Sequence, residues 1–295
     1  MSVKSAVVIN PSKATDIEER RRELRDALAA AGWPEPLWLE TTPEDPGCGM
    51  ARAAAEAGVE VVLVYGGDGT VMAVAGELAG SDVAVALIPS GTGNLLATNL
   101  GIPRDVAEAV AVAVAGERRR IDVGEVEGAG AFTVMAGMGF DAAMVGETPD
   151  DAKRRFGWAA YVASGLRNLT RRRMSVRIRL DGGRWLHRRA AAVLVANVGR
   201  LQGGIRLFPD AQLDDGELDV AVLTPAHVAD WARLAGGVLL ARRAAPGLET
   251  FRARAVEIHA TREEPREIDG DVIAPGRRLS ARVRPGALTV CVPPS

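Results

Sequence analysis

A short segment near residue 68 combines the residue types that bind phosphate: Tyr65-Gly66-Gly67-Asp68-Gly69-Thr70. Its three glycines let the backbone turn sharply and approach a ligand closely. Their amides, with the free amides of a following helix, would form an anion site suited to phosphate. Asp68 would repel bare phosphate, so its presence favours a magnesium ion between the two groups. The alternative is a tight strand–helix turn that binds no ligand.

A second glycine-containing loop follows the next apolar run: Pro89-Ser90-Gly91-Thr92-Gly93-Asn94. The first apolar run leads into Asn10-Pro11-Ser12-Lys13, where Lys13 could meet phosphate charge, although a surface lysine after a turn is the commoner case. Ligands of open α/β sheets bind outside the carboxyl ends of the strands, so we expect these loops to line one crevice. Neither glycine loop has the spacing of a Walker P-loop or a dinucleotide fingerprint, which argues against a P-loop NTPase and a dehydrogenase.

The elements around these loops alternate between strand and helix. Apolar runs predict buried parallel strands, and segments with helical periodicity lie between them. The expected strands are residues 3–10, 36–40, 59–65 and 83–88, and the expected helices are residues 15–32, 50–57, 70–79 and 105–115. Thr15 and Glu18 form a capping-box pattern at the start of the first helix. This order predicts right-handed crossovers and a parallel sheet with helices on its faces.

From about residue 120 the apolar period changes to two, which predicts β-strands. We expect strands at residues 174–180, 185–198, 218–223, 251–259, 279–283 and 288–292, with helical segments at 150–170 and 226–243. A turn at Pro285-Gly286 would make the last two strands a hairpin. The predicted fold class is an α/β N-terminal domain with a parallel sheet, residues 1–122, and a mainly antiparallel β-sandwich C-terminal domain, residues 123–295. The last segment could return to the first domain, and we expect the two domains to share a cleft.

The composition excludes several classes of protein. The chain has 295 residues, of which 47% are hydrophobic and 25% charged, enough for a sizeable core, and its net charge of −2 argues against nucleic acid as a partner. Cys48 and Cys291 lie far apart and the three histidines are isolated, so we expect neither a disulfide framework nor a zinc site. There is no signal-peptide pattern and no apolar run of membrane-spanning length, so we expect a cytoplasmic protein.

The two glycine loops, in this order, resemble the diacylglycerol kinase catalytic family, which includes bacterial diacylglycerol kinases, YegS-type lipid kinases, and sphingosine and ceramide kinases. Four later segments continue the resemblance: Ile121-Asp122-Val123-Gly124, Gly137-Met138-Gly139-Phe140-Asp141-Ala142, Leu213-Asp214-Asp215-Gly216-Glu217-Leu218-Asp219-Val220 and Ile268-Asp269-Gly270-Asp271. The resemblance therefore runs along nearly the whole chain.

The resemblance implies a kinase that moves the γ-phosphate of ATP onto a lipid hydroxyl. It implies ATP contacts at Asn10, Pro11, Ser12, Lys13, Thr42, Gly66, Gly67, Asp68, Gly69, Thr70, Gly91, Thr92, Gly93 and Asn94. Asp68 and Asp122 would act on a catalytic Mg2+ or its waters, and Asp271 would be the general base. A second, structural Mg2+ would be bound by Asp215 and by the backbone carbonyls of Gln212 and Glu217.

Two positions depart from the family pattern. The family usually has glutamate where this chain has Asp271, and the shorter side chain withdraws the carboxylate by about 1.5 Å. A misplacement of about 1 Å can cost on the order of a hundredfold in rate. Aspartate can still accept a hydroxyl proton, because its reference pKa is close to that of glutamate. Leu95 stands where an acid often follows the Gly-Thr-Gly-Asn motif.

Two segments combine apolar and basic side chains, as in soluble enzymes that bind an anionic bilayer. They cover residues 153–173, with Phe156, Trp158 and Tyr161, and residues 231–243, with Trp231 and Arg242-Arg243. A helix packed in the core with solvated ends would have the same composition. The resemblance favours the membrane, so we expect a lipid substrate and peripheral binding at the inner face of the membrane.

Other functions stay open at this point. NAD kinases share the glycine–aspartate loop, so a soluble nucleotide acceptor is the main alternative. The segments around Asp215 and Asp271 favour the lipid branch, and no NAD-kinase-like Asn-Glu motif follows the glycine loop. A nucleotide-binding sensor with a decayed base is the non-enzymatic alternative. The identity of the lipid is open, as is a homodimer.

Overall fold

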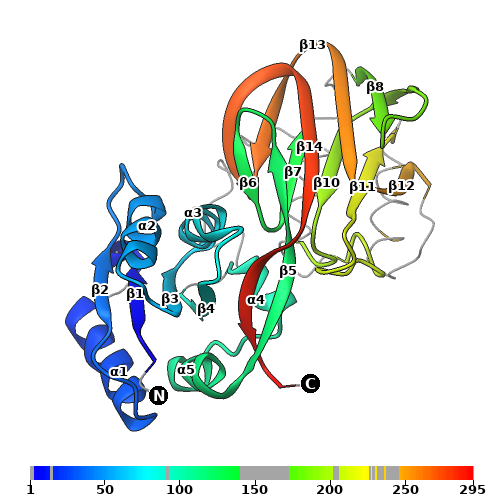
Figure 1. Cartoon of the computed structure of the whole chain (residues 1–295). Helices are drawn as coiled ribbons and strands as arrows, with labels where there is room; N and C mark the ends of the chain where they lie inside the picture. Colours follow the sequence, from blue (N-terminus) through cyan, green and yellow to red (C-terminus); the bar gives the residue numbers. More distant parts are fainter. Residues whose placement is uncertain are drawn as a thin grey trace. The chain divides into compact units, whose positions relative to one another are not determined.

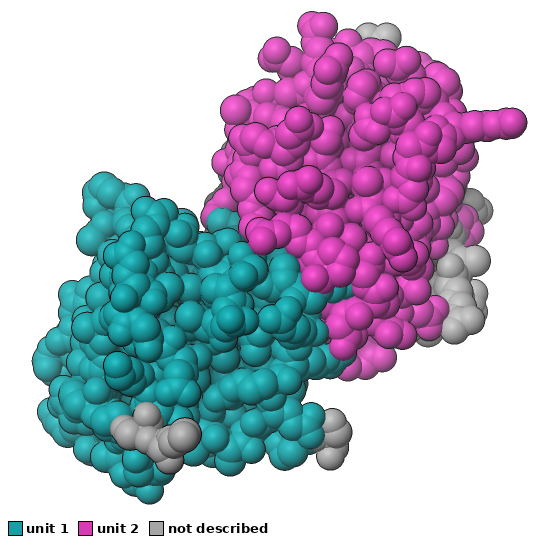
Figure 2. Space-filling view, in the orientation of Figure 1, with its two compact units in different colours: residues 1–123, 286–295 teal, residues 124–285 magenta. Residues whose placement is uncertain are grey.

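The computed structural model describes residues 3–13, 16–90, 93–139, 173–201, 206–225, 227, 230, 236 and 246–294. The chain forms two compact units, coloured separately in Figure 2. Unit 1 contains residues 1–123 and 286–295, and unit 2 contains residues 124–285. Strands β5 (Glu117–Val126) and β14 (Asp271–Val292) each contribute residues to both units.

Unit 1 is built around a parallel sheet with the strand order β2-β1-β3-β4-β14 (Figure 1). Its other strands are β1 (Ser5–Ile9), β2 (Leu37–Glu40), β3 (Val61–Gly66) and β4 (Ala84–Pro89). Every residue of β1 and β3 is buried. Strands covered on both faces have no solvent side, which is why these two are nearly continuous apolar runs in the sequence.

Helices cover both faces of this sheet. They are α1 (Ile17–Ala30), α2 (Cys48–Glu56), α3 (Asp68–Leu78), α4 (Leu95–Asn99) and α5 (Val106–Ala115), with a short 3-10 helix at Pro11–Lys13. Helix α1 packs against α5 on one side of the strands, and α2 packs against α3 on the other (Figure 1). Among the helices that the structure describes, none is long and apolar enough to cross a membrane.

Two helix starts differ from the sequence prediction. The N-cap of α1 is Asp16, whose carboxylate accepts the N–H groups of Glu18 and Glu19 at 3.0 Å each, whereas Thr15 was predicted and lies outside the described residues. Aspartate is at least as good an N-cap as threonine. Helix α3 begins at Asp68, two residues before the predicted start at Thr70. Asp68 therefore belongs to the first helical turn.

Unit 2 is a mainly antiparallel β-sandwich. Its strands are β6 (Gly130–Phe132), β7 (Met135–Met138), β8 (Met174–Leu180), β9 (Leu186–Ala190), β10 (Ala192–Ala196), β11 (Leu218–Leu223), β12 (Leu248–Ala253) and β13 (Ala255–Ile268), with parts of β5 and β14. One ladder runs β12-β11-β10-β7-β13-β14 (Figure 1). The β8–β9 pair joins β13, β5 joins β14, and β6 pairs with β5. The first half of β13 pairs with β8 and its last residues pair with β7, so this strand serves two sets of strands.

The predicted C-terminal hairpin is wrong. Strand β14 continues from Asp271 to Val292, and beyond Gly286 it pairs in parallel with β4, Val290 opposite Val85. Gly286 has a φ of 54°, and its N–H donates to the Asp122 carboxylate at 2.7 Å. At Pro285-Gly286 the chain therefore bends within one strand and does not reverse direction, and the Gly286 N–H meets the Asp122 carboxylate.

Two other predicted strands are each divided in the structure. Residues 185–198 contain β9 and β10, and residues 251–259 contain the end of β12 and the start of β13. Alternation of apolar and polar residues does not show where a chain leaves one partner strand for another. The predicted helix at 150–170 lies outside the described residues, as does nearly all of the predicted helix at 226–243.

Candidate active site

The carboxyl ends of four parallel strands bring most of the predicted ATP-binding residues to one edge of the unit 1 sheet. Strand β1 leads into Asn10–Lys13, β2 into Thr42, β3 into Gly66–Thr70, and β4 into the segment that ends at Asn94. Backbone bonds align the ends: Thr41 N–H donates to the Ile9 carbonyl at 3.0 Å, and Asn10 N–H to the Tyr65 carbonyl at 2.9 Å. Gly91 and Thr92 lie outside the described residues.

Lys13 lies beside the start of helix α3. A Cβ atom added to Gly67 would lie 3.5 Å from Lys13 Cε, and the Tyr65 hydroxyl donates to the Lys13 carbonyl at 3.4 Å. Gly67 is the N-cap of α3 and offers no side chain to the free amides of the first turn. These amides and the positive end of the helix dipole favour an anion, and the Lys13 ammonium adds a full charge.

Side chains tie the loop after β1 to the loop after β3. Asn10 Nδ2 donates to Thr70 Oγ1 at 3.2 Å, and the Ser12 N–H and hydroxyl both donate to Asn10 Oδ1, at 3.0 and 2.8 Å. Gly66 is required here, because a Cβ at this position would lie 2.6 Å from Thr70 Cβ. The loop after β1 is therefore held directly against the first turn of α3.

Asp68 links the two glycine loops through backbone amides. Its Oδ2 accepts the Asn94 N–H at 3.0 Å and its Oδ1 accepts the Leu95 N–H at 2.6 Å, so the carboxylate caps the start of α4. Asn94 has a φ of 49° and its Nδ2 donates to the Ser90 carbonyl at 3.0 Å. Each oxygen of Asp68 therefore accepts one N–H group, and the carboxylate holds the start of α4.

Asp122 also accepts a backbone N–H group. Its residue is 1% exposed, and its Oδ1 accepts the Gly286 N–H in unit 1. A neighbouring position explains a glycine of the same motif: the Phe132 ring covers Gly124, and a Cβ on Gly124 would lie 2.0 Å from Phe132 Cζ. Two of the four positions in the Ile121–Gly124 motif therefore have a structural role: Asp122 accepts the Gly286 N–H, and Gly124 leaves room for the Phe132 ring.

Asp271 is the first residue of β14 and lies at a tight turn in unit 2. Asp269 and Gly270 form the turn with φ values of 49° and 90°, and Ile268 pairs with Asp271 across it. The Asp269 carboxylate accepts three backbone N–H groups and one hydroxyl, from Thr133, Val134 and Met135, at 2.8–3.1 Å. Burial raises the pKa of Asp269 to about 6, although these hydrogen bonds oppose the shift. Asp269 thus fixes the turn, while Asp271 is exposed.

Glu267 is a buried carboxyl that the sequence analysis did not single out. It is 4% exposed and pairs with Gly137 on β7, whose missing side chain makes room for it. Burial, and then the charge of Asp269, raise the pKa of Glu267 to about 7. Alternation with the apolar Ile268 would place Glu267 on the solvent side of the strand, so its burial beside Gly137 of β7 could not be seen in the sequence.

The predicted structural Mg2+ site contains a side-chain cation. Asp215 Oδ2 lies 2.7 Å from a guanidinium nitrogen of Arg252, and the same guanidinium approaches Asp219 and Glu217. Burial raises the pKa of Asp219 to about 6, against the opposing charge of Arg252. In the described part of the chain, no group of three or more His, Cys, Asp or Glu side chains is arranged to hold a metal ion.

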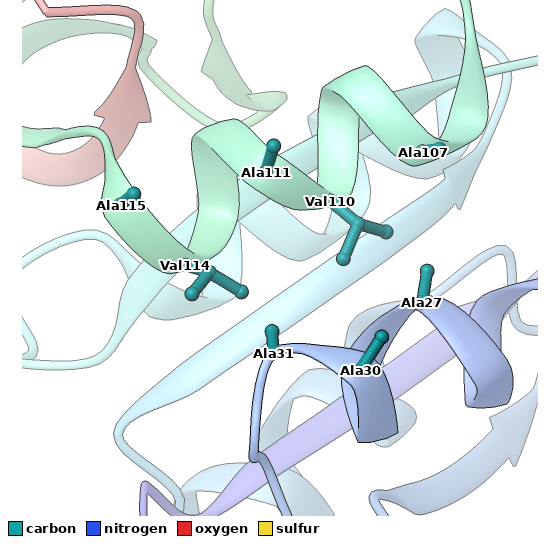
Figure 3. Close-up of a pocket in the computed structure, with 8 residues that line it drawn as sticks. All are labelled: Ala27, Ala30, Ala31, Ala107, Val110, Ala111, Val114 and Ala115. Carbon is teal, nitrogen blue, oxygen red and sulfur yellow. The ribbon is translucent and has the colours of Figure 1, made fainter.

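A separate open groove of about 370 Å³ lies between helices α1 and α5 (Figure 3). Its lining consists only of alanine and valine side chains, and Figure 3 shows Ala27 and Ala30 of α1 facing Val110 and Val114 of α5. It offers no polar side chain to a triphosphate, so it does not compete with the edge of the sheet as a nucleotide site.

A parallel-sheet unit with glycine loops at the carboxyl ends of its strands, together with a β-sandwich, defines a two-domain class of kinases. Residues 4–126 match the diacylglycerol kinase catalytic domain, and residues 133–292 match the YegS C-terminal NAD kinase beta sandwich-like domain. The chain belongs to the diacylglycerol kinase catalytic family, in its YegS-like branch. It is therefore a kinase, and kinases of this family use ATP.

Relatives match over nearly the full length. A protein of Pseudomonas fluorescens named "Probable lipid kinase YegS-like" is 32% identical, and the match covers 99% of this chain and 97% of the relative. A protein of the same name from Pseudomonas aeruginosa is 34% identical over 92% of this chain and 90% of its own. The crystal structure of a diacylglycerol kinase from Bacillus anthracis has the same fold, with a TM-score of 0.79, 24% identity, and coverage of 98% of this chain and 96% of that chain.

Proposed function

We propose that this kinase transfers the γ-phosphate of ATP to the hydroxyl of a lipid. The observation that carries the proposal is the edge of the unit 1 sheet, where Lys13 lies beside the uncapped start of α3. Support for a lipid acceptor comes from the full-length relatives, which are named probable lipid kinases.

In unit 1, the chain's own residues bind and orient the triphosphate. Lys13 and the first-turn amides of α3 neutralise phosphate oxygens, which is the main task in phosphoryl transfer. Asn10 and Thr70 keep the loop after β1 against that turn. Asp68 keeps the second glycine loop in place through two amides.

In unit 2, Asp271 acts as the general base. The lipid hydroxyl oxygen forms a bond to the γ-phosphorus, the bond between that phosphorus and the β–γ bridging oxygen breaks, and ADP leaves. The hydroxyl proton passes to the Asp271 carboxylate. Asp269 is a positioning residue, because its four hydrogen bonds fix the turn that carries Asp271.

Mg2+ enters the proposal as the counter-ion of the triphosphate. The metal neutralises phosphate charge when it is bound with ATP. Asp68 and Asp122 would act on its position through the backbone they hold, since Asp68 accepts the N–H groups of Asn94 and Leu95 and Asp122 accepts the Gly286 N–H.

The acceptor would be reached at the inner face of a membrane, by peripheral binding. The basic and apolar segments at 153–173 and 231–243 motivate this part of the proposal, and their structure lies outside the described residues. Sedimentation with vesicles of anionic and of neutral lipid tests it. Equal binding to both would contradict electrostatic attraction to the membrane.

The proposed reaction is tested by transfer of label from γ-labelled ATP into a total lipid extract, with NAD offered in a parallel reaction. We expect label in a lipid, and a rise in the KM for ATP of about tenfold or more for Lys13→Met, because a charge-assisted phosphate contact is lost. Lys4→Met is the matched control, since Lys4 precedes β1 at the opposite end of the strand. Label on NAD and on no lipid would overturn the proposal.

A further inference from the structure

Three carboxylates of unit 2 surround one arginine. Asp215 and Glu217 come from the loop before β11, Asp219 lies in β11, and Arg252 lies in β12. Asp219 and Arg252 are direct partners in the β11–β12 register. The family resemblance assigns a structural Mg2+ to this loop, at Asp215 and the carbonyls of Gln212 and Glu217.

The guanidinium of Arg252 contacts three carboxylates and one backbone carbonyl. It lies 2.7 Å from Asp215 Oδ2, 3.4 Å from Asp219 Oδ1 and 3.7 Å from Glu217 Oε2. It also donates to the backbone carbonyl of Asp210 at 3.1 Å. The second oxygen of Asp215 accepts the Glu217 N–H at 3.1 Å. Carboxylate and carbonyl oxygens are the ligands that Mg2+ prefers, and here a guanidinium satisfies both kinds.

Arg252 compensates part of the negative charge around this loop. Asp215 and Asp219 are mostly buried, with side-chain exposures of 18% and 14%. Carboxylates withdrawn from water to this extent need a cation or hydrogen-bond donors. Arg252 supplies one full charge and a planar set of donors that matches carboxylate geometry. A divalent ion at Asp215 would have to displace this arginine or share its carboxylate.

We propose that Arg252 is a built-in cation that takes the place of the family's structural Mg2+, so that unit 2 is stable without a divalent metal. The proposal concerns the stability of this unit and does not depend on the identity of the phosphate acceptor.

The experiment measures the Tm of the full chain without nucleotide, in EDTA and in millimolar MgCl2 or CaCl2. We expect the wild-type Tm to be the same in all three conditions. Arg252→Gln should lower the Tm in EDTA by about 2–4 °C or more. Divalent cation should then restore part of the loss, because the three carboxylates become free to bind it.

Arg188→Gln is the matched control, since Arg188 pairs with Glu249 of the same strand β12 through three hydrogen bonds. Its Tm should fall without rescue by divalent cation. A saturable rise of the wild-type Tm with Mg2+ would overturn the proposal, and this readout stands even if Arg252→Gln does not fold. An Arg252→Gln Tm equal to that of wild type would also overturn it.

Discussion

At the scale of single residues, one acid in each unit holds backbone amides of a predicted motif. Asp68 accepts the amides of Asn94 and Leu95, and Asp269 accepts the amides of Thr133, Val134 and Met135. An ionised carboxylate that receives several N–H groups is a strong local constraint, because charge-assisted hydrogen bonds are about twice as strong as neutral ones. Each of these acids therefore fixes a loop that carries other predicted site residues.

Replacing Asp68 tests this role. Asp68→Ala leaves two amides without their acceptor and should lower the free energy of unfolding by about 2 kcal/mol, and it should also raise the KM for ATP. The measurements are urea unfolding and initial rates. Asp105→Ala is the control, because Asp105 caps α5 through the Glu108 N–H. It should lower stability and leave the KM unchanged; an equal KM effect in both variants would contradict the role of Asp68.

Glu267 makes stability depend on pH in a defined direction. Its pKa is raised from 4.5 to about 7 in the folded chain, so the folded state binds more protons than the unfolded state between these values. Stability is therefore lost as the pH rises through this window. Glu267→Gln should stabilise the chain at pH 8, by up to about 3 kcal/mol, and much less at pH 5.

Urea unfolding at the two pH values measures this difference. Glu263→Gln is the control, at an exposed position of the same strand β13. A Glu267→Gln variant that gains the same stability at pH 5 as at pH 8 would show that Glu267 is already ionised in the folded state throughout this range.

At the scale of elements, β14 has two environments along one strand. Val272 is 64% exposed near its start, whereas Val290 is fully buried beside β4. Val290→Ala should lower the free energy of unfolding by about 2 kcal/mol, because it leaves a cavity in the core of unit 1. Val272→Ala should change it by less than about 0.5 kcal/mol.

Hydrogen exchange locates the effect of Val290→Ala. Faster exchange is expected in β4 and not in β10 of unit 2. If the two valine variants were equally stable, the C-terminal part of β14 would contribute little to the sheet of unit 1.

The sequence predicted the parallel sheet well and allowed the last segment to return to the first domain, but it wrongly predicted a hairpin at Pro285-Gly286. Strands β1 and β3 are buried on both faces, so their apolar runs identify them directly. Pro285-Gly286 has the composition of a turn, but β14 continues through it, where the Gly286 N–H donates to the distant Asp122 carboxylate. Motifs likewise identified the loops around Asp68 and Asp271. They did not identify Glu267 or Arg252, whose partners come from distant strands.

At the scale of the whole molecule, the proposed reaction divides its work between the two units. Unit 1 contributes Lys13 and the start of α3, which would bind ATP, and unit 2 contributes Asp271, which would accept the proton. Changes in unit 1 should therefore act on the KM for ATP, and changes at Asp271 should act on kcat. We also expect Asp271→Glu, which introduces the family's usual residue, to retain activity, because both carboxylates can accept the hydroxyl proton.

The most direct test of this division is to measure lipid phosphorylation and ATP binding for Asp271→Asn beside wild type. The account predicts a fall in kcat of about 10²–10⁴-fold, because the amide cannot accept the hydroxyl proton. The Kd for ATP should stay within about twofold of wild type, since the phosphate-binding groups belong to unit 1. Lipid phosphorylation by Asp271→Asn at the wild-type rate would contradict the account.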